Sequence, residues 1–184
     1  TLADLQGTKI RVGGGIVNDV TSAMGAVSLL KAAPEAYEIL SNGVADGTFF
    51  PAESIKSFKL EQIVKYATQV PGGLYNTSFV MLMNEDRFNK LSKADQDAVM
   101  SVSGEALARV AGNAWDPADK AGWEAARAAG VQVTTASPAL VSEIKAKIAS
   151  VESNWVNEAK PKGLDGAKVL ADFRAEIQKV ASGK

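Results

Sequence analysis

The sequence predicts an α/β fold with a mostly parallel sheet, and three observations lead to this prediction. Short apolar runs alternate with helical patterns over residues 1–50, one long helical pattern covers residues 92–129, and two more helical patterns end the chain. Alternating strands and helices favour a parallel sheet, because each helix returns the chain to the start of the next strand. With 184 residues, 46% of them apolar, the chain suffices for one large domain or two small ones.

The first part of the chain has the order strand, helix, strand, helix, strand. Gly25 and the pair Asn42-Gly43 close the two helices, since glycine readily adopts the left-handed conformation that follows a helix, and Pro34 opens the second one. The expected strands cover residues 8–12, 26–30 and 44–45, and the expected helices cover 17–24 and 34–40. Ligands of such sheets bind beyond the carboxyl ends of the strands, so the segments after the first and third strands should share one edge.

The second part is mainly helical, with the expected strands at residues 66–71 and 78–84 on either side of a Gly-rich joint. Ser92 caps a helical pattern that ends at Gly130. If continuous, about 37 residues at ~1.5 Å each would reach about 55 Å, enough to tie two lobes together, with a kink at Pro117. The remaining expected elements are a helix over 51–66, a strand over 131–134, a helix that starts at Ser137-Pro138 and an amphipathic helix over 163–181.

Composition excludes several classes of function. Twenty basic and 21 acidic side chains give a net charge of −1 without blocks of like charge, so we expect no nucleic acid partner. The chain lacks cysteine and histidine, which removes Ser-His-Asp triads, thiolate or imidazole metal sites and haem ligation. We expect no metal and no cofactor. No apolar run reaches the ~18 residues of a membrane span, and the first residues lack a signal-peptide pattern, so we expect a soluble chain whose export signal has been removed.

Arg11 ends the first expected strand and is followed by Gly13, Gly14 and Gly15. Three interpretations are open: a phosphate cradle, a carboxylate clamp, or an ordinary strand-to-turn junction with a solvated arginine. The spacing of neither a Walker loop nor a dinucleotide fingerprint is present, which argues against a nucleotide. Because glycine has no side chain, these three residues would still allow an anion to approach the backbone N–H groups closely.

The segment after the third expected strand contains Phe49, Phe50 and Pro51, where a surface loop normally carries polar residues. Adjacent residues of an extended segment face opposite ways, so one ring can enter the core while the other faces a cavity. Burial of both rings in the core is an equally good interpretation at this point. Asp46, just before them in Asp46-Gly47, is typical of a turn.

Several segments resemble the substrate-binding proteins of tripartite ATP-independent periplasmic (TRAP) transporters of the DctP type. Leu5-Gln6-Gly7-Thr8-Lys9-Ile10-Arg11 matches the family's leucine-x-glycine-x-lysine-x-arginine strand, and EAYEILSNGVADG at residues 35–47 matches its next motif. The likeness continues through Phe50-Pro51, KSFKLEQIVKY, LYNTSFVMLMNEDRFNKLSKADQDAV and the long helical pattern, and so covers essentially the whole chain.

The resemblance implies a periplasmic receptor with two lobes that closes on a small organic acid and delivers it to a TRAP membrane permease. In such proteins the arginine that ends the strand, here Arg11, pairs with the carboxylate, a role that suits its planar fork. Gly13 and Gly14 would bring the backbone close to the same anion, and Asn76 would lie at the hinge. The family implies a monomer and no catalysis.

Two departures from the family pattern restrict the expected ligand. Members that bind polar sugar acids carry asparagine in an Asp-Gly-x-x-Asn-Pro loop, whereas this chain has Phe50 in that position. The family commonly has Trp or Phe ahead of the next helix, whereas this chain has Ala33. Because an apolar site does not satisfy many hydroxyl groups, we expect a monocarboxylate with an apolar or aromatic body, bound by Arg11, Gly13, Gly14, Ala33, Phe49, Phe50 and Asn76.

A third departure concerns the first lobe. Family members begin with a further βα lobe ahead of the leucine-x-glycine segment, on which this chain almost starts, so we expect the N-terminal lobe to be largely absent from these residues. Residues 1–76 and 117–184 would form the second, ligand-binding lobe, and residues 77–116 would return to the first.

Two other classes of protein are alternatives. A carboxylate-dependent enzyme would need a positioned partner for Asp46 or another acid, and the sequence indicates none. An α-helical or α/β interaction module would expose an aromatic stripe along the helical patterns, in which Trp115, Trp123 and Trp155 have the spacing of core residues.

Overall fold

The computed structural model describes residues 1–182, which form two compact units. Of the described residues, the first unit combines Thr1–Lys31, Ala45–Gly47 and residues 137–182, and the second combines Ala32–Val44 and Thr48–Ala136. The lobes expected from the resemblance have other boundaries, and that division of the chain stays a prediction.

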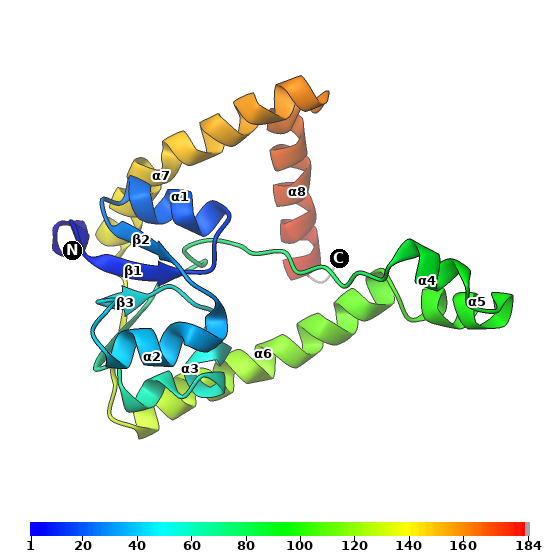
Figure 1. Cartoon of the computed structure of the whole chain (residues 1–184). Helices are drawn as coiled ribbons and strands as arrows, with labels where there is room; N and C mark the ends of the chain where they lie inside the picture. Colours follow the sequence, from blue (N-terminus) through cyan, green and yellow to red (C-terminus); the bar gives the residue numbers. More distant parts are fainter. Residues whose placement is uncertain (183–184) are drawn as a thin grey trace. The chain divides into compact units, whose positions relative to one another are not determined.

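The first unit is built on a βαβ motif (Figure 1). Strand β1 (Lys9–Val12) leads into helix α1 (Ile16–Ala23) and then into strand β2 (Val27–Leu30). The two strands pair in parallel, with Lys9 opposite Val27 and Val12 opposite Leu30. The parallel sheet and both strands expected from the sequence are therefore confirmed.

The third strand of this sheet begins later than the sequence predicted. The sheet order is β2-β1-β3, and β3 is Gly47–Thr48, not residues 44–45. Asp46 explains the shift: its backbone N–H donates to the Lys9 carbonyl at 2.8 Å, and its carboxylate accepts from the Lys9 N–H at 2.7 Å. Pairing with β1 thus starts at Asp46, one residue after the buried Ala45.

Two long helices complete the first unit. Helix α7 (Pro138–Ala159) packs against α1, and helix α8 (Gly166–Ala181) follows it after a short 3-10 turn (Figure 1). Ser137 caps α7 by accepting from the Leu140 N–H, as the Ser-Pro pair predicted. The larger buried apolar side chains of this unit include Ile10, Val12, Val17, Val20, Met24, Ile144 and Val151.

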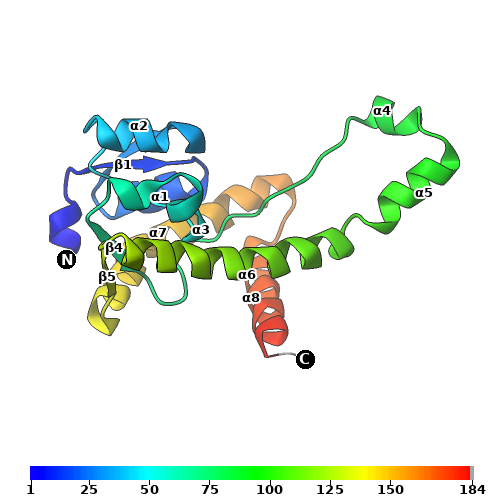
Figure 2. The ribbon, with the colours of Figure 1, turned by 90° about the horizontal axis from the view of Figure 1, so that it is seen from below.

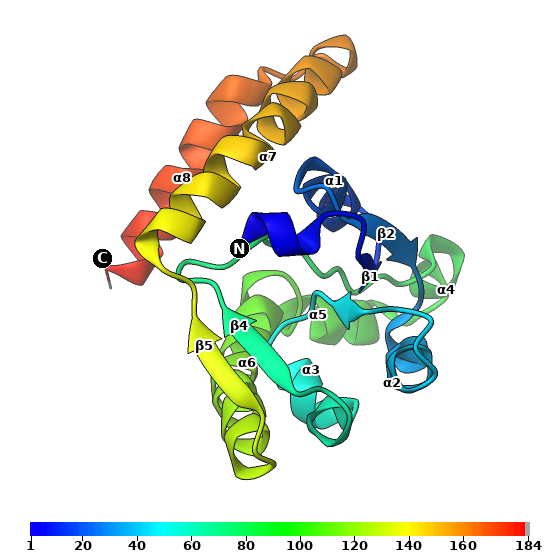
Figure 3. The same cartoon turned by 90° about the vertical axis from the view of Figure 1, so that its left-hand side faces the viewer.

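The second unit contains a two-stranded parallel sheet and most of the helices. Strand β4 (Tyr66–Gln69) pairs with β5 (Gln132–Thr135), and the two lie side by side in Figure 3. Helix α3 (Glu53–Ser57) packs along α6 (Glu105–Ala128), as Figure 2 shows. The other elements of this unit are a 3-10 turn at Ala33–Glu35, α2 (Ala36–Ser41), a 3-10 turn at Leu60–Gln62, α4 (Glu85–Asn89) and α5 (Lys93–Ser101).

Three expectations for the second unit were wrong. The helical pattern over residues 51–66 breaks because Lys59 adopts a left-handed conformation with φ of 55°. The pattern over 92–129 is split into α5 and α6 at Gly104, which has φ of 61°, so the longest helix has 24 residues, about 36 Å. Residues 78–84 form no strand, because no other strand within residues 1–182 pairs with them.

Candidate functional site

Arg11 lies on β1 with its side chain held in the first unit. Only 2% of its surface is exposed, and both its Nε–H and its Nη2–H donate to the Lys31 carbonyl oxygen, at 2.9 and 2.6 Å. The Lys31 N–H in turn donates to the Val12 carbonyl at 3.1 Å, which ties this acceptor to the end of β1. The interpretation of Arg11 as a solvated arginine in an ordinary turn is therefore wrong. Because a guanidinium is always charged, Arg11 places a fixed positive charge at the carboxyl end of a parallel strand.

The glycines after β1 differ in what the fold requires of them. Gly14 has φ of 105°, which side-chain-bearing residues rarely adopt, and Gly15, with φ of 65°, is the N-cap of α1. Gly13 has no such φ, and a Cβ added to it would lie 3.8 Å from Arg11 Nη2, an ordinary contact distance. The backbone conformation therefore requires glycine at position 14, whereas glycine at position 13 leaves the space beside the Arg11 guanidinium without a side chain.

The aromatic segment belongs to the second unit. Phe49 and Phe50 directly follow β3, the strand next to β1 in the sheet order, and both side chains are half-buried. The Phe50 ring stacks on Phe58, with ring centres 5.5 Å apart and an interplanar angle of 18°. Phe58 closes α3, so the two rings stand at the two ends of this short helix.

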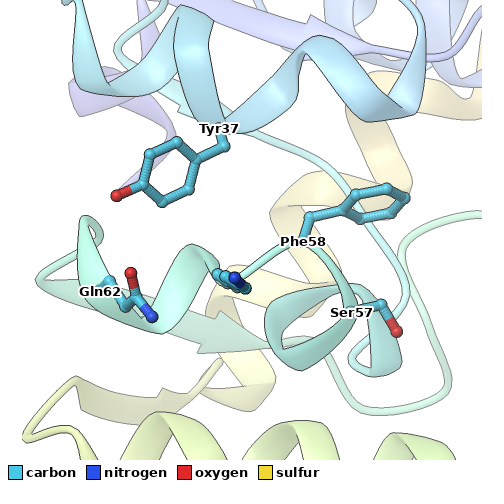
Figure 4. Close-up of a pocket in the computed structure, with 5 residues that line it drawn as sticks. Tyr37, Ser57, Phe58 and Gln62 are labelled. Atoms are coloured by element: carbon cyan, nitrogen blue, oxygen red, sulfur yellow. The ribbon is translucent and has the colours of Figure 1, made fainter.

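A shallow depression of about 420 Å³ lies next to this stack in the same unit, lined by Tyr37, Ser57, Phe58, Lys59 and Gln62. In Figure 4 the Tyr37 ring extends from α2 toward Gln62, and the Phe58 ring turns away from it. Neither Phe58 nor Tyr37 was predicted from the sequence as a site residue, because each is a single aromatic residue in a helical pattern, which predicts core packing as readily as a site.

The two remaining predicted site residues also lie in the second unit. Ala33 is half-buried in the 3-10 turn that precedes α2, where the Ala32 N–H donates to the Glu35 carboxylate at 2.9 Å. Asn76 is exposed in the segment between β4 and α4. Their roles as an opened wall and a hinge stay predictions.

Within residues 1–182, no three acidic side chains come together in a group that could hold a metal ion. No helix in the described part of the chain has both the length and the apolar character needed to cross a membrane.

Comparison with known proteins agrees with this geometry. A TRAP periplasmic solute-binding protein from Bordetella bronchiseptica, solved with bound (R)-mandelate and (S)-mandelate, is 45% identical with a TM-score of 0.90, and the match covers 98% of this chain and 57% of that one. A TRAP solute-binding protein from Rhodoferax ferrireducens, solved with copurified benzoate, is 29% identical with a TM-score of 0.91, over 99% of this chain and 57% of that one. A curated relative, TsaT of Comamonas testosteroni, named an outer membrane transporter protein, is 29% identical over 173 residues, which is 94% of this chain and 51% of TsaT.

The fold matches solved TRAP solute-binding proteins, which defines its class as that of the solute-binding proteins. Residues 1–158 match the DctP family, the bacterial extracellular solute-binding proteins of family 7, and the chain belongs to this family. The resemblance to TRAP substrate-binding proteins and the periplasmic localisation are thereby confirmed, and the matched proteins are receptors, not enzymes. The chain spans about half the length of TsaT and 57% of each of these solved structures.

Proposed function

We propose that this chain binds a small organic acid with an apolar or aromatic body, and that it delivers this acid to a TRAP membrane permease. The buried guanidinium of Arg11 is the observation that carries the proposal. Two hydrogen bonds to Lys31 O hold its plane in one orientation, and a planar guanidinium suits bidentate pairing with a carboxylate. The N-terminus of α1 follows directly after the glycines, and its partial positive charge favours the same anion.

The body of the acid is inferred from the aromatic segment. Phe50 replaces an amide donor with a ring, and its stack on Phe58 offers an apolar surface in the segment that follows β3. A polyhydroxylated acid would leave several hydroxyl groups without partners against such a surface, which lowers its affinity. Mandelate and benzoate, the ligands of the two similar solved proteins, are acids with an aromatic body. We include Gly13, Gly14, Ala33, Phe49 and Asn76 in the proposed site.

Family membership supports the proposed delivery to a permease. In TRAP systems the receptor and the permease are separate subunits, so binding must alter the receptor in a way that the permease detects. A receptor that closes around its ligand, with Asn76 in the hinge, would do so.

A binding panel tests the proposal. The chain would be titrated calorimetrically with benzoate, mandelate, isobutyrate and D-glucuronate, and the same titrations would be made with Arg11→Met and with Arg109→Met. Arg109 is the matched control, because it is an exposed arginine on α6 that pairs with Glu105.

We expect the aromatic or branched acids to bind and glucuronate not to bind, and we expect binding to be lost in Arg11→Met but not in Arg109→Met. At about 1,000 times its dissociation constant, such a ligand should also stabilise the protein by about 4 kcal/mol, a melting shift of roughly 8 to 16 °C. Glucuronate binding without benzoate or isobutyrate binding would refute the proposed ligand class, and equal affinities of Arg11→Met and the unmodified chain would refute the anchor.

A further inference from the structure

Helix α6 presses against the start of α3 at a single glycine of the second unit. Gly122 is buried, and a Cβ built on it would lie 1.9 Å from the Ala52 carbonyl oxygen, 2.6 Å from the carbonyl carbon and 3.1 Å from Glu53 Cα. The first two distances are shorter than Cβ contacts in proteins, and the atoms met belong to the backbone, which cannot turn aside as a side chain can. Glycine is unfavourable within a helix. At position 122 it permits an approach that no other residue allows.

Asp119 makes a second contact to the same place. It lies three residues before Gly122, on the same face of α6, and its Oδ1 accepts a hydrogen bond from the Glu53 backbone N–H at 2.8 Å. Glu53 is the first residue of α3, and the N-cap residue, Ala52, has no side chain that could accept this bond. Asp119 therefore supplies from another helix the cap that α3 lacks.

The aromatic stack lies on either side of the helix turn that these two contacts hold. Phe50 precedes Ala52 by two residues, with the rigid Pro51 between them, and Phe58 follows the last residue of α3. Because the two rings stack at 5.5 Å, a displacement of the first turn of α3 moves one ring relative to the other. The position of the two stacked rings thus depends on α6 as well as on the segment that carries them.

We propose that Gly122 and Asp119 are positioning residues that set which acid bodies the receptor accepts, by fixing the Phe50–Phe58 stack on α6. This inference rests on the proposed function, in which Arg11 binds the carboxylate and the aromatic segment contacts the body. It assigns the selectivity for the body to residues that touch neither part of the ligand.

The test compares two pairs of variants on one helix. Gly122→Ala is paired with Gly112→Ala, since an added Cβ at Gly112 meets no atom within 4 Å. Asp119→Ala is paired with Asp116→Ala, an exposed acid one turn earlier on α6. Dissociation constants would be measured for benzoate and for isobutyrate, which share the carboxylate and differ in the size and shape of the body.

We expect Gly122→Ala and Asp119→Ala to weaken benzoate binding about tenfold or more while isobutyrate binding changes by less than about threefold, a change in selectivity of the size that a reshaped apolar pocket produces. The controls should keep both affinities. Amide hydrogen exchange of Glu53, measured without ligand, should be faster in Asp119→Ala than in Asp116→Ala, because the protecting acceptor is lost.

An equal loss of both affinities would mean that the contact has a purely structural role, and it would overturn the inference. Unchanged affinities for both acids would overturn it as well. Either result leaves the proposed function standing, since that depends on the Arg11→Met comparison. If the unmodified chain bound neither acid, the proposed function and this extension of it would both be wrong.

Discussion

Replacement of Arg11 by lysine separates the charge of the anchor from its shape. Arginine gives the Lys31 carbonyl two hydrogen bonds, at 2.9 and 2.6 Å, whereas a lysine ammonium is a point donor that can give it one. A hydrogen bond that involves a charged group contributes about 1.5 to 3 kcal/mol net. Loss of one such bond should therefore lower the free energy of unfolding by about 1.5 to 3 kcal/mol, which urea denaturation would measure.

The same argument gives the effect on the ligand. A carboxylate that accepts two parallel N–H bonds from a guanidinium keeps only one from an ammonium, and the loss of about 1.5 to 3 kcal/mol corresponds to a roughly 10- to 150-fold weaker affinity. Calorimetric titration of benzoate into Arg11→Lys would measure this, with Arg109→Lys as the exposed control. Affinity within twofold of the unmodified chain would mean that charge alone binds the acid and that the planar fork is not used.

Two further predictions concern backbone geometry and capping. Gly14→Ala should destabilise the fold by about 1 to 2 kcal/mol because of its φ of 105°. Gly13→Ala should leave stability within about 0.5 kcal/mol but weaken benzoate binding, since the new Cβ would lie 3.8 Å from Arg11 Nη2. Urea denaturation would measure the stabilities and titration the affinities, and equal destabilisation by both variants would contradict the different roles assigned to the two glycines. Ser137→Ala should lower stability by ~1 kcal/mol through loss of the cap to Leu140. Ser153→Ala, within α7 and away from its N-terminus, should have no measurable effect in the same assay.

The ends of the elements that local chemistry controls were predictable from the sequence. Gly25 closes α1, Ser92 caps α5 and Ser137 caps α7 in the structure, because capping depends on a few neighbouring residues and on allowed values of φ. The alternation of strand and helix predicted the parallel pairing of β1 and β2 for the same reason: apolar periodicity is a property of the segment itself. The family motifs then placed Arg11 at the end of a strand.

Features that depend on distant partners were decided only by the tertiary structure. Residues 78–84 have the composition of a strand but form none, since a strand exists only where another strand accepts its hydrogen bonds. Nothing near Arg11 in the sequence identifies the Lys31 carbonyl as its acceptor, because any residue can supply that group. By local rules alone, Gly122 is an unfavourable residue within a helix. Its reason is the contact with Ala52, seventy positions away, because close packing of two backbones is a property of neither segment alone.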